Sequence, residues 1–84
     1  MTVIVEKQPK KYLQGVDEAT RRKLLKGIDN IQTMTGDIKK LKGTANTFRY
    51  KIAHYRIIYK WRQSESTIII TEINARTNIK YSRR

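Results

Sequence analysis

Residues 48–59 read as two strands joined by a tight turn, and cations alternate in them with aromatic and β-branched residues. Because neighbouring side chains of a strand point to opposite faces, Arg49 and Lys51 share one face while the apolar residues beside them face the other. Arg56 adds a third cation on the second strand. The segment therefore requires a sheet with one packed face and one cationic face, and the cationic face is a candidate site for an anion.

The chain is strongly basic, and the excess charge lies mainly in its second half. Its 84 residues include 19 Lys and Arg against 7 Asp and Glu, a formal net charge of +12. Residues 1–35 contribute +3 and residues 36–84 contribute +9. Such a field attracts polyanions in a salt-dependent manner, so nucleic-acid phosphate is the favoured partner. An anionic membrane, an acidic protein and a basic face that serves only solubility are the alternatives.

Length and composition predict one small domain, residues 1–84, with a modest core. With no cysteine and a single histidine, the chain lacks a disulfide framework, a thiolate site and a histidine cluster, so we expect no metal and no cofactor. No apolar run approaches the ~20 residues of a membrane span, and the N-terminus lacks a signal-peptide layout. We therefore expect a cytoplasmic protein with no membrane partner.

The remaining patterns predict an α+β domain in which two N-terminal helices cover one face of a small antiparallel sheet of about four strands. The strands are expected at residues 3–7, 47–53, 55–61 and 67–73, and the helices at residues 9–14 and 17–33. Leu24, Leu25, Ile28 and Ile31 give the second helix its apolar spacing. The last three strands should form a meander with residues 3–7 at its edge. Residues 37–46 read as a basic connector.

Several short motifs resemble, in order and spacing, the RelE/ParE superfamily of bacterial toxins. The motifs are Leu41-Lys42-Gly43, Phe48-Arg49-x-Lys51, Tyr55-Arg56-Ile57-Ile58-Tyr59, the apolar run from Ile68 to Ile73, and Arg76 with Tyr81. The resemblance extends over nearly the whole chain and is most specific at Tyr-Arg-Ile-Ile-Tyr preceded by alternating cations. It implies a RelE-like toxin of a type II toxin–antitoxin system. For the RelE branch it implies an endoribonuclease that cuts messenger RNA in the ribosomal A site.

The implied partners are messenger RNA, the ribosome with its 16S rRNA, and a cognate acidic antitoxin. An antitoxin of this kind would cover the basic face with an acidic, amphipathic segment and form a hetero-oligomer with the toxin. Such a toxin acts in the cytoplasm of a bacterium or archaeon. The sequence does not reveal codon preference, strict ribosome dependence or how the antitoxin inhibits.

Metal-free RNA cleavage, in which the ribose 2′-hydroxyl attacks the adjacent phosphorus, requires three contributions from the enzyme. These are removal of the hydroxyl proton, stabilisation of charge on the phosphoryl oxygens and protonation of the leaving 5′-oxygen. Arg56 and Arg76, with support from Arg49, are the expected stabilisers, because a planar guanidinium matches the phosphoryl oxygens. Neighbouring cations favour a neutral amine, which makes Lys51 the leading acid or base candidate. No acidic residue is expected among these cations.

Residues beyond the strands complete the expected site. The resemblance implies that Tyr81 stacks on or hydrogen-bonds the RNA at the scissile step. Asn74-Ala75 replaces the pair that often precedes the family's downstream arginine, which leaves open whether Tyr81, Arg83 or neither holds that position. His54 is a weak proton-transfer candidate because imidazole titrates near ~6.5, or it serves only the turn. Further RNA contacts are expected from Lys39, Lys40, Lys42, Lys80, Arg83 and Arg84.

Each assignment has a plainer alternative. Arg49 and Lys51 would also discourage edge pairing as exposed strand cations, and Arg56 could form an ion pair with Glu72 on the neighbouring strand. Aromatic residues are expected in the core or on the packed face rather than as RNA-stacking platforms, namely Tyr50, Tyr55, Tyr59 and Trp61. The alternative functions are a ParE-like inhibitor of DNA gyrase without nuclease chemistry, and a non-catalytic RNA- or ribosome-binding domain.

Overall fold

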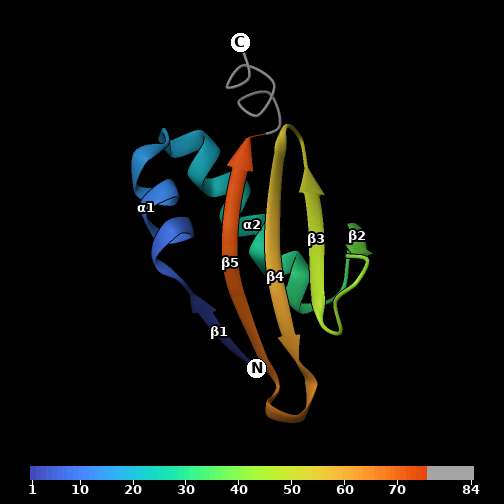
Figure 1. Cartoon of the computed structure of the whole chain (residues 1–84). Coiled ribbons are helices and arrows are strands. Elements are labelled where there is room, and N and C mark those ends of the chain that lie inside the picture. The colour runs from blue at the N-terminus through green and yellow to red at the C-terminus, as the bar shows by residue number, and fades with distance from the viewer. Residues whose placement is uncertain (76–84) are drawn as a thin grey trace.

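The computed structural model describes residues 1–75, which form a five-strand sheet with two helices on one face (Figure 1). The elements are β1 (Thr2–Val5), α1 (Lys7–Gly15), α2 (Glu18–Gln32), β2 (Asp37–Lys40), β3 (Thr47–Ile52), β4 (Tyr55–Arg62), the 3-10 turn η1 (Gln63–Glu65) and β5 (Thr67–Ala75). The α+β class and the helical layer on one face are therefore confirmed. None of the helices in residues 1–75 is long and apolar enough to span a membrane.

The strand order in the sheet is β1-β5-β4-β3-β2. The predicted meander of β3, β4 and β5 is confirmed, and β1 lies at the edge as expected. However, β1 pairs with β5 in parallel, so the sheet is mixed and not purely antiparallel. The apolar residues of β1 specify which face is buried, but they do not specify the direction of the strand relative to its neighbour.

The expectation of a basic connector over residues 37–46 is wrong in its first part, because Asp37–Lys40 forms β2 and brings the strand count to five. β2 pairs antiparallel with β3, from Asp37 opposite Lys51 to Lys40 opposite Phe48. Its sequence contains one apolar residue, Ile38, so little hydrophobic pattern marks it as a strand. Main-chain pairing with β3 holds it, and its lysines suit an exposed sheet edge.

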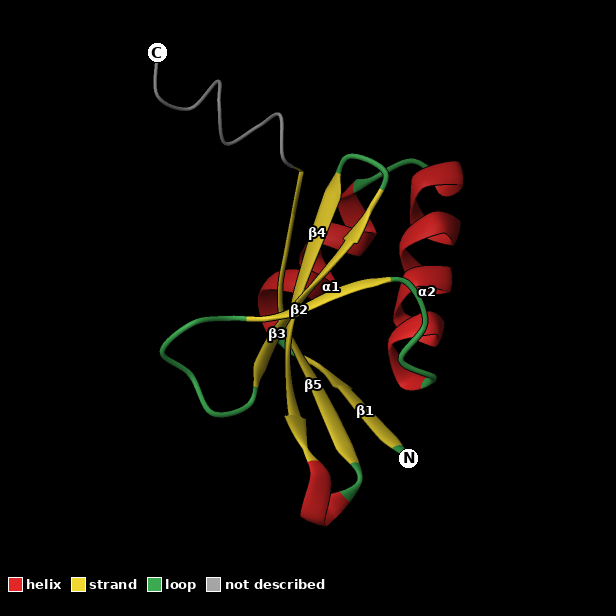
Figure 2. Ribbon diagram, turned by 90° about the vertical axis from the view of Figure 1, so that its right-hand side faces the viewer, coloured by secondary structure: helices red, strands yellow, loops and turns green. Residues whose placement is uncertain are grey.

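The core lies between α2 and the covered face of the sheet, where the two layers meet in Figure 2. Leu24, Ile28 and Ile31 of α2 are 0%, 6% and 0% exposed, whereas Leu25 is 46% exposed and contributes little. Burying one such aliphatic side chain contributes about 1.5–3 kcal/mol. The sheet supplies the other buried members of the cluster, namely Tyr50, Ile57, Tyr59, Ile68, Ile70 and Ile73.

Tyr50 of β3 is enclosed between two glycines. A Cβ on Gly27 of α2 would lie 3.0 Å from Tyr50 Cε2, and one on Gly36 would lie 2.6 Å from Tyr50 Cε1. Gly36 also has a φ of +113°, a conformation that side chains disfavour. Asn30 Nδ2 donates a hydrogen bond to the Tyr50 hydroxyl at 3.1 Å. These contacts fix β3 against the helical layer and thereby fix which of its residues face the other side.

A β-bulge in β5 places polar residues of this strand on the same face of the sheet as the polar residues of β4. Tyr59 lies opposite Ile70, but its neighbour Ile58 lies opposite Glu72, so Thr71 is an extra residue in the strand. The Thr71 hydroxyl donates to the Ile58 carbonyl at 3.2 Å across this bulge. The bulge explains how a nearly continuous apolar strand buries residues on both sides of position 71 and still turns Glu72 to the uncovered face.

Candidate functional site

Figure 2 shows the helices on one side of the sheet. The opposite face carries two cross-strand rows of mostly polar side chains. The first row, from β2 to β5, is Asp37, Lys51, Arg56 and Asn74, and the second is Lys39, Arg49, Ile58 and Glu72. Directly opposite residues have Cβ atoms about 4.5–5.5 Å apart. Lys39, Arg49, Lys51 and Arg56 are therefore contiguous, and we call them the cation cluster.

Two guanidinium groups of the cation cluster are enclosed and incompletely hydrogen-bonded. The Arg49 side chain is 15% exposed, and its Nη2 lies 4.0 Å from Asp37 Oδ1, at the outer limit of an ion pair. Within residues 1–75, Arg49 Nη1 and Arg56 Nε are shielded from solvent and make no hydrogen bond. Buried polar groups are normally satisfied, so these two shielded donors are a cost to the fold within the described residues.

Acidic residues occupy two corners of the rows, which corrects the expectation that the cations stand without carboxylates. Asp37 lies opposite Lys51 and beside Arg49. The sequence does not identify it, because β2 has a single apolar residue and therefore reads as a connector. Glu72 stands at the other corner, and its Oε2 accepts a 2.6 Å hydrogen bond from Asn74 Nδ2.

The alternative in which Arg56 forms an ion pair with Glu72 is not found in the described part of the chain. Residues 1–75 contain two ion pairs, Arg22–Glu18 on α2 and Arg49–Asp37. Across the β4–β5 ladder, Arg56 faces Asn74 rather than Glu72. Arg56 therefore remains free of a carboxylate within these residues.

The turn between β3 and β4 lies at the same end of the sheet as the end of β5, as Figure 1 shows. The turn is Ala53-His54, as the sequence predicts, and Ala53 adopts a positive φ of 53°. His54 is exposed and lies in the turn that closes the ladder just beyond the Lys51–Arg56 and Ile52–Tyr55 pairs. His54 thus lies at the end of the cation cluster that contains Lys51 and Arg56, and its role in proton transfer stays a prediction.

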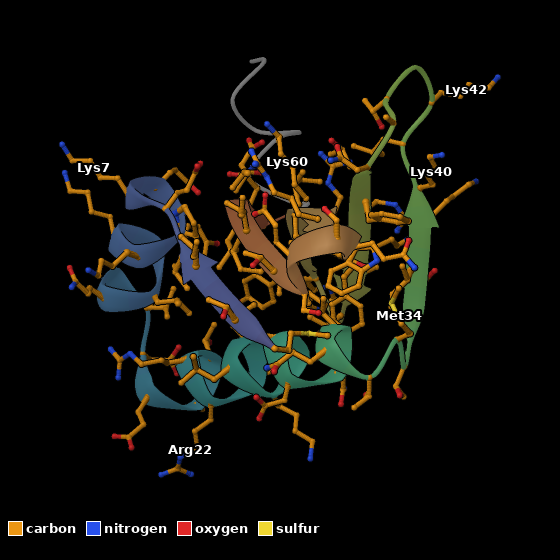
Figure 3. All side chains as sticks on the ribbon, turned by 90° about the horizontal axis from the view of Figure 1, so that it is seen from below. Lys7, Arg22, Met34, Lys40, Lys42 and Lys60 are labelled. Atoms are coloured by element: carbon orange, nitrogen blue, oxygen red, sulfur yellow. The ribbon has the colours of Figure 1, made fainter. Side chains whose placement is uncertain are left out.

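The expected tract of three lysines is divided by the fold. Lys39 lies beside Arg49 on the open face, whereas Lys40 lies opposite Phe48 and takes the other side of β2. Lys42 projects from the loop after β2, away from the sheet (Figure 3). Only Lys39 joins the cation cluster directly, and RNA contacts by the other two stay a prediction.

Sequence reasoning passed over two further cations of β4, Lys60 and Arg62. Both are exposed and continue the alternation that begins at Arg56, so they extend the basic surface along the strand. Figure 3 shows Lys60 on the side of the molecule opposite to Arg22 of α2. The same period of two that places Arg56 on the open face could have identified them.

The remaining predicted site residues lie outside the described residues, namely Arg76, Lys80, Tyr81, Arg83 and Arg84. Arg76 directly follows Ala75, the last residue of β5. Ala75 pairs with Tyr55, next to the Arg56–Asn74 pair. The roles assigned to these five residues stay predictions.

The aromatic residues belong to the helix-covered face, as the sequence predicts. Tyr50 and Tyr59 are 3% and 0% exposed, and Trp61 and Tyr55 pack against the same core. The rings of Phe48 and Tyr59 stack with centroids 5.4 Å apart and an interplanar angle of 17°. Burial raises the pKa of Tyr59 to about 12. These rings stabilise the fold and do not form an RNA-stacking platform on the open face.

Solved structures of RelE proteins share this fold. A RelE–RelB complex from the archaeon Pyrococcus horikoshii OT3 matches with a TM-score of 0.74 and 28% identity over 89% of this chain and 93% of that chain. A RelB–RelE complex from Methanococcus jannaschii matches with a TM-score of 0.73 and 26% identity over 92% and 94% of the two chains. The isolated RelE toxin of E. coli matches with a TM-score of 0.73 over 99% and 96%, at 13% identity, a likeness of fold alone.

No protein-family model matches the chain, and no curated protein sequence matches it either. The structural likeness nevertheless extends over about nine-tenths of this chain and of each archaeal RelE match. The class defined by the fold is therefore a RelE-like α+β domain with a cationic open face. The resemblance to the RelE/ParE superfamily of toxins that the motifs indicated is confirmed.

Proposed function

We propose that the protein is the toxin of a type II toxin–antitoxin pair and an endoribonuclease that cleaves messenger RNA on the ribosome. The observation that carries the proposal is the cation cluster, in which Lys39, Arg49, Lys51 and Arg56 are contiguous on the open face of the sheet. Nucleic-acid phosphate supplies the charge and the geometry that guanidinium groups bind best. The RelE-like fold, together with RelE toxins among its structural neighbours, supports the same conclusion.

In the proposed reaction the scissile phosphate lies against Arg56, with Arg76 from the end of β5 as the second stabiliser. The ribose 2′-oxygen forms a bond to phosphorus while the bond from phosphorus to the 5′-oxygen breaks, leaving a cyclic 2′,3′-phosphate and a free 5′-hydroxyl. The negative charge that develops on the phosphoryl oxygens is where fixed guanidinium groups contribute most. Arg49 and Lys39 hold neighbouring phosphates of the backbone.

Lys51 is the proposed proton-transfer group. It lies directly opposite Arg56 on the neighbouring strand, so its amine reaches the same phosphate. As a neutral amine it would accept the proton of the 2′-hydroxyl, and as an ammonium it would give one to the leaving 5′-oxygen. Tyr81 and His54 are the further candidates for contact with the reacting nucleotide.

The proposed protein partner is an acidic antitoxin. Neighbours solved as complexes of RelE with RelB come from Pyrococcus horikoshii OT3, Methanococcus jannaschii and E. coli. A net charge of +12 leaves this chain with a surface that an acidic segment would neutralise. The same surface would bind the backbone of 16S rRNA and messenger RNA once the antitoxin is removed.

The decisive experiment replaces Arg56 and Arg76 by alanine, singly, and measures cleavage of messenger RNA on programmed ribosomes. Loss of one positioned stabiliser costs about 10² to 10³ in rate, so each variant should cleave slowly and fail to arrest growth. Arg22→Ala is the matched control, because Arg22 is an exposed arginine of α2 that points away from the sheet (Figure 3). Full toxicity of both Arg56→Ala and Arg76→Ala would overturn the proposal.

Primer extension after induction separates the proposed nuclease from the other functions that the fold allows. Site-specific cuts within translated messages, present for wild type and absent for Arg56→Ala, support cleavage. Growth arrest with intact messages and inhibited gyrase would instead identify a ParE-like activity. Ribosome binding with intact messages would identify a non-catalytic binding domain. Cleavage of naked RNA at the same rate would remove the ribosome from the proposal.

A further inference from the structure

The strand that carries part of the proposed site is only half covered by its edge neighbour. β1 pairs with β5 from Thr67 to Ile70, and the Glu6 main-chain N–H donates to the Ile70 carbonyl at 3.0 Å. Beyond this point the side chain of Gln8, on α1, takes the place of a strand. Its Oε1 accepts from the Ile73 main-chain N–H at 2.9 Å, and its Nε2 donates to the Ile73 carbonyl at 3.0 Å.

A carboxamide offers the same donor and acceptor as a peptide group, so Gln8 satisfies both main-chain groups of Ile73 at once. The residues on both sides of this contact are buried. Pro9, the next residue of α1, is fully buried, and Ile73 is 0% exposed. A two-point contact of this kind fixes the position of β5 along its length as well as its distance from α1.

The contact lies where the geometry of the cation cluster depends on β5. Ile73 is opposite Ile57, and the next pair along the ladder is Asn74 with Arg56. Ala75 ends the strand, and Arg76 is the following residue in the chain. Any slippage or fraying of the end of β5 would therefore alter the neighbour of Arg56 on the open face.

We infer that Gln8 is a positioning residue for the cation cluster, acting through the main chain of Ile73 to hold the end of β5 in register with β4. The inference rests on the proposed nuclease function for its effect on catalysis, and on the structure alone for its effect on β5. Gln8 lies on α1, in the helical layer, and does not contact the proposed phosphate site on the open face. Its effect is therefore on the rate of the chemical step and not on RNA affinity.

The first test compares Gln8→Ala with Gln14→Ala, a matched control on the same helix with an exposed glutamine. In single-turnover cleavage on programmed ribosomes, Gln8→Ala should lower the rate by about 10- to 100-fold, the usual effect of a small misplacement of reacting groups. Affinity for the programmed ribosome should stay within about twofold, since the cations that bind phosphate are intact. An unchanged rate, or a loss confined to affinity, overturns the inference.

A double-mutant cycle separates positioning from a general loss of stability. If Gln8 acts through the end of β5, Gln8→Ala should cost little further rate in an Arg56→Ala background, because the cluster residue that it positions is already absent. Equal fold-losses in the wild-type and Arg56→Ala backgrounds would show that Gln8 serves only the fold. All rates are measured well below the unfolding midpoint of each variant.

Amide hydrogen exchange tests the contact without reference to RNA. The Ile73 amide should exchange faster in Gln8→Ala, stay slow in Gln14→Ala, and stay slow in Gln8→Glu, which keeps the acceptor but loses the donor. Unchanged Ile73 exchange in Gln8→Ala overturns the inference even if wild type cleaves RNA. If wild type cleaves no RNA, the proposed function fails, and faster exchange at Ile73 and Asn74 still supports the structural part of the inference.

Discussion

The two faces of the sheet are built by the same strands, yet they serve opposite purposes. On β4, Ile57 is 0% exposed beneath α2, while its neighbour Arg56 stands on the open face beside Lys51. The covered face gains stability by burying apolar area. The open face concentrates like charges, which opposes folding but attracts polyanions. Because side chains of a strand alternate between the two faces of the sheet, stability and binding can be adjusted separately at adjacent positions of one strand.

The faces also differ in how their polar atoms are satisfied. On the covered face the Tyr50 hydroxyl accepts a hydrogen bond from Asn30. On the open face Arg49 Nη1 and Arg56 Nε make none within residues 1–75. Tyr59 is the exception on the covered face, since its buried hydroxyl has no partner in the described chain. A buried donor or hydroxyl without a partner is a cost to folding on either face.

The largest expected effect comes from truncating the covered face at Ile57. Ile57→Ala should lower the free energy of unfolding by about 2–5 kcal/mol, because the methyl groups leave a cavity between the sheet and α2. Arg56→Ala, one residue away, should change it by no more than about 0.5 kcal/mol. Urea denaturation followed by circular dichroism measures both, and Ile57→Val offers a graded variant with an expected loss of about 0.5–1.5 kcal/mol. Equal destabilisation by Arg56→Ala and Ile57→Ala would contradict the division of roles between the faces.

The second expected effect is a gain of stability on the covered face. Tyr59→Phe removes the unpartnered hydroxyl and should stabilise the protein by up to about 1 kcal/mol. Because burial raises the pKa of Tyr59 to about 12, above the ordinary tyrosine value of about 10, the unfolded chain loses this proton first as pH rises. Wild type should therefore lose stability between about pH 10 and 12, and Tyr59→Phe should lose less. Unfolding followed by fluorescence over this range checks both statements, and a steeper alkaline loss in the variant would be the contrary result.

The smallest expected effect lies on the open face at Asp37. In the proposed complex its carboxylate, which is 60% exposed, would compete with RNA phosphate for Arg49. Exposed ion pairs contribute about 0.2–1 kcal/mol, so Asp37→Asn should tighten RNA binding by roughly 1.5- to 5-fold with little change in stability. The salt dependence of binding by fluorescence anisotropy provides the measurement, with Asp29→Asn on α2 as a control. Weaker binding by Asp37→Asn would show that the carboxylate organises Arg49 for RNA instead of competing with it.

Much of the fold could be predicted because local patterns and packing agree. The two helices, the Ala53-His54 turn and the β3–β4–β5 meander follow from periodicity and turn length. The edges of the sheet could not be predicted as well. β2 is held by main-chain pairing more than by apolar residues, and the parallel direction of β1 depends on contacts with β5, which is distant in sequence.

The candidate site was predicted where it depends on alternation within one strand. Arg49, Lys51 and Arg56 meet on the open face because each is fixed by its own strand and by the β3–β4 register. Asp37 and the placement of Asn74 opposite Arg56 depend on β2 and on the bulge at Thr71, which leave little trace in the sequence. Gln8 was missed for the same reason, since its contact with Ile73 spans 65 positions of the chain.

The pairing of β1 and α1 with β5 also determines when the sheet is completed during synthesis of the chain. Residues 1–15 can pack and pair with β5 only after residues 67–75 have been synthesised and have left the ribosome. β5 is also the strand that lies between β1 and β4, so the sheet stays divided until it arrives. Contacts of such high sequence separation form late and slowly. A nascent chain therefore carries the cations of β3 and β4 before the sheet is complete, so the proposed site is assembled only after β5 has been synthesised.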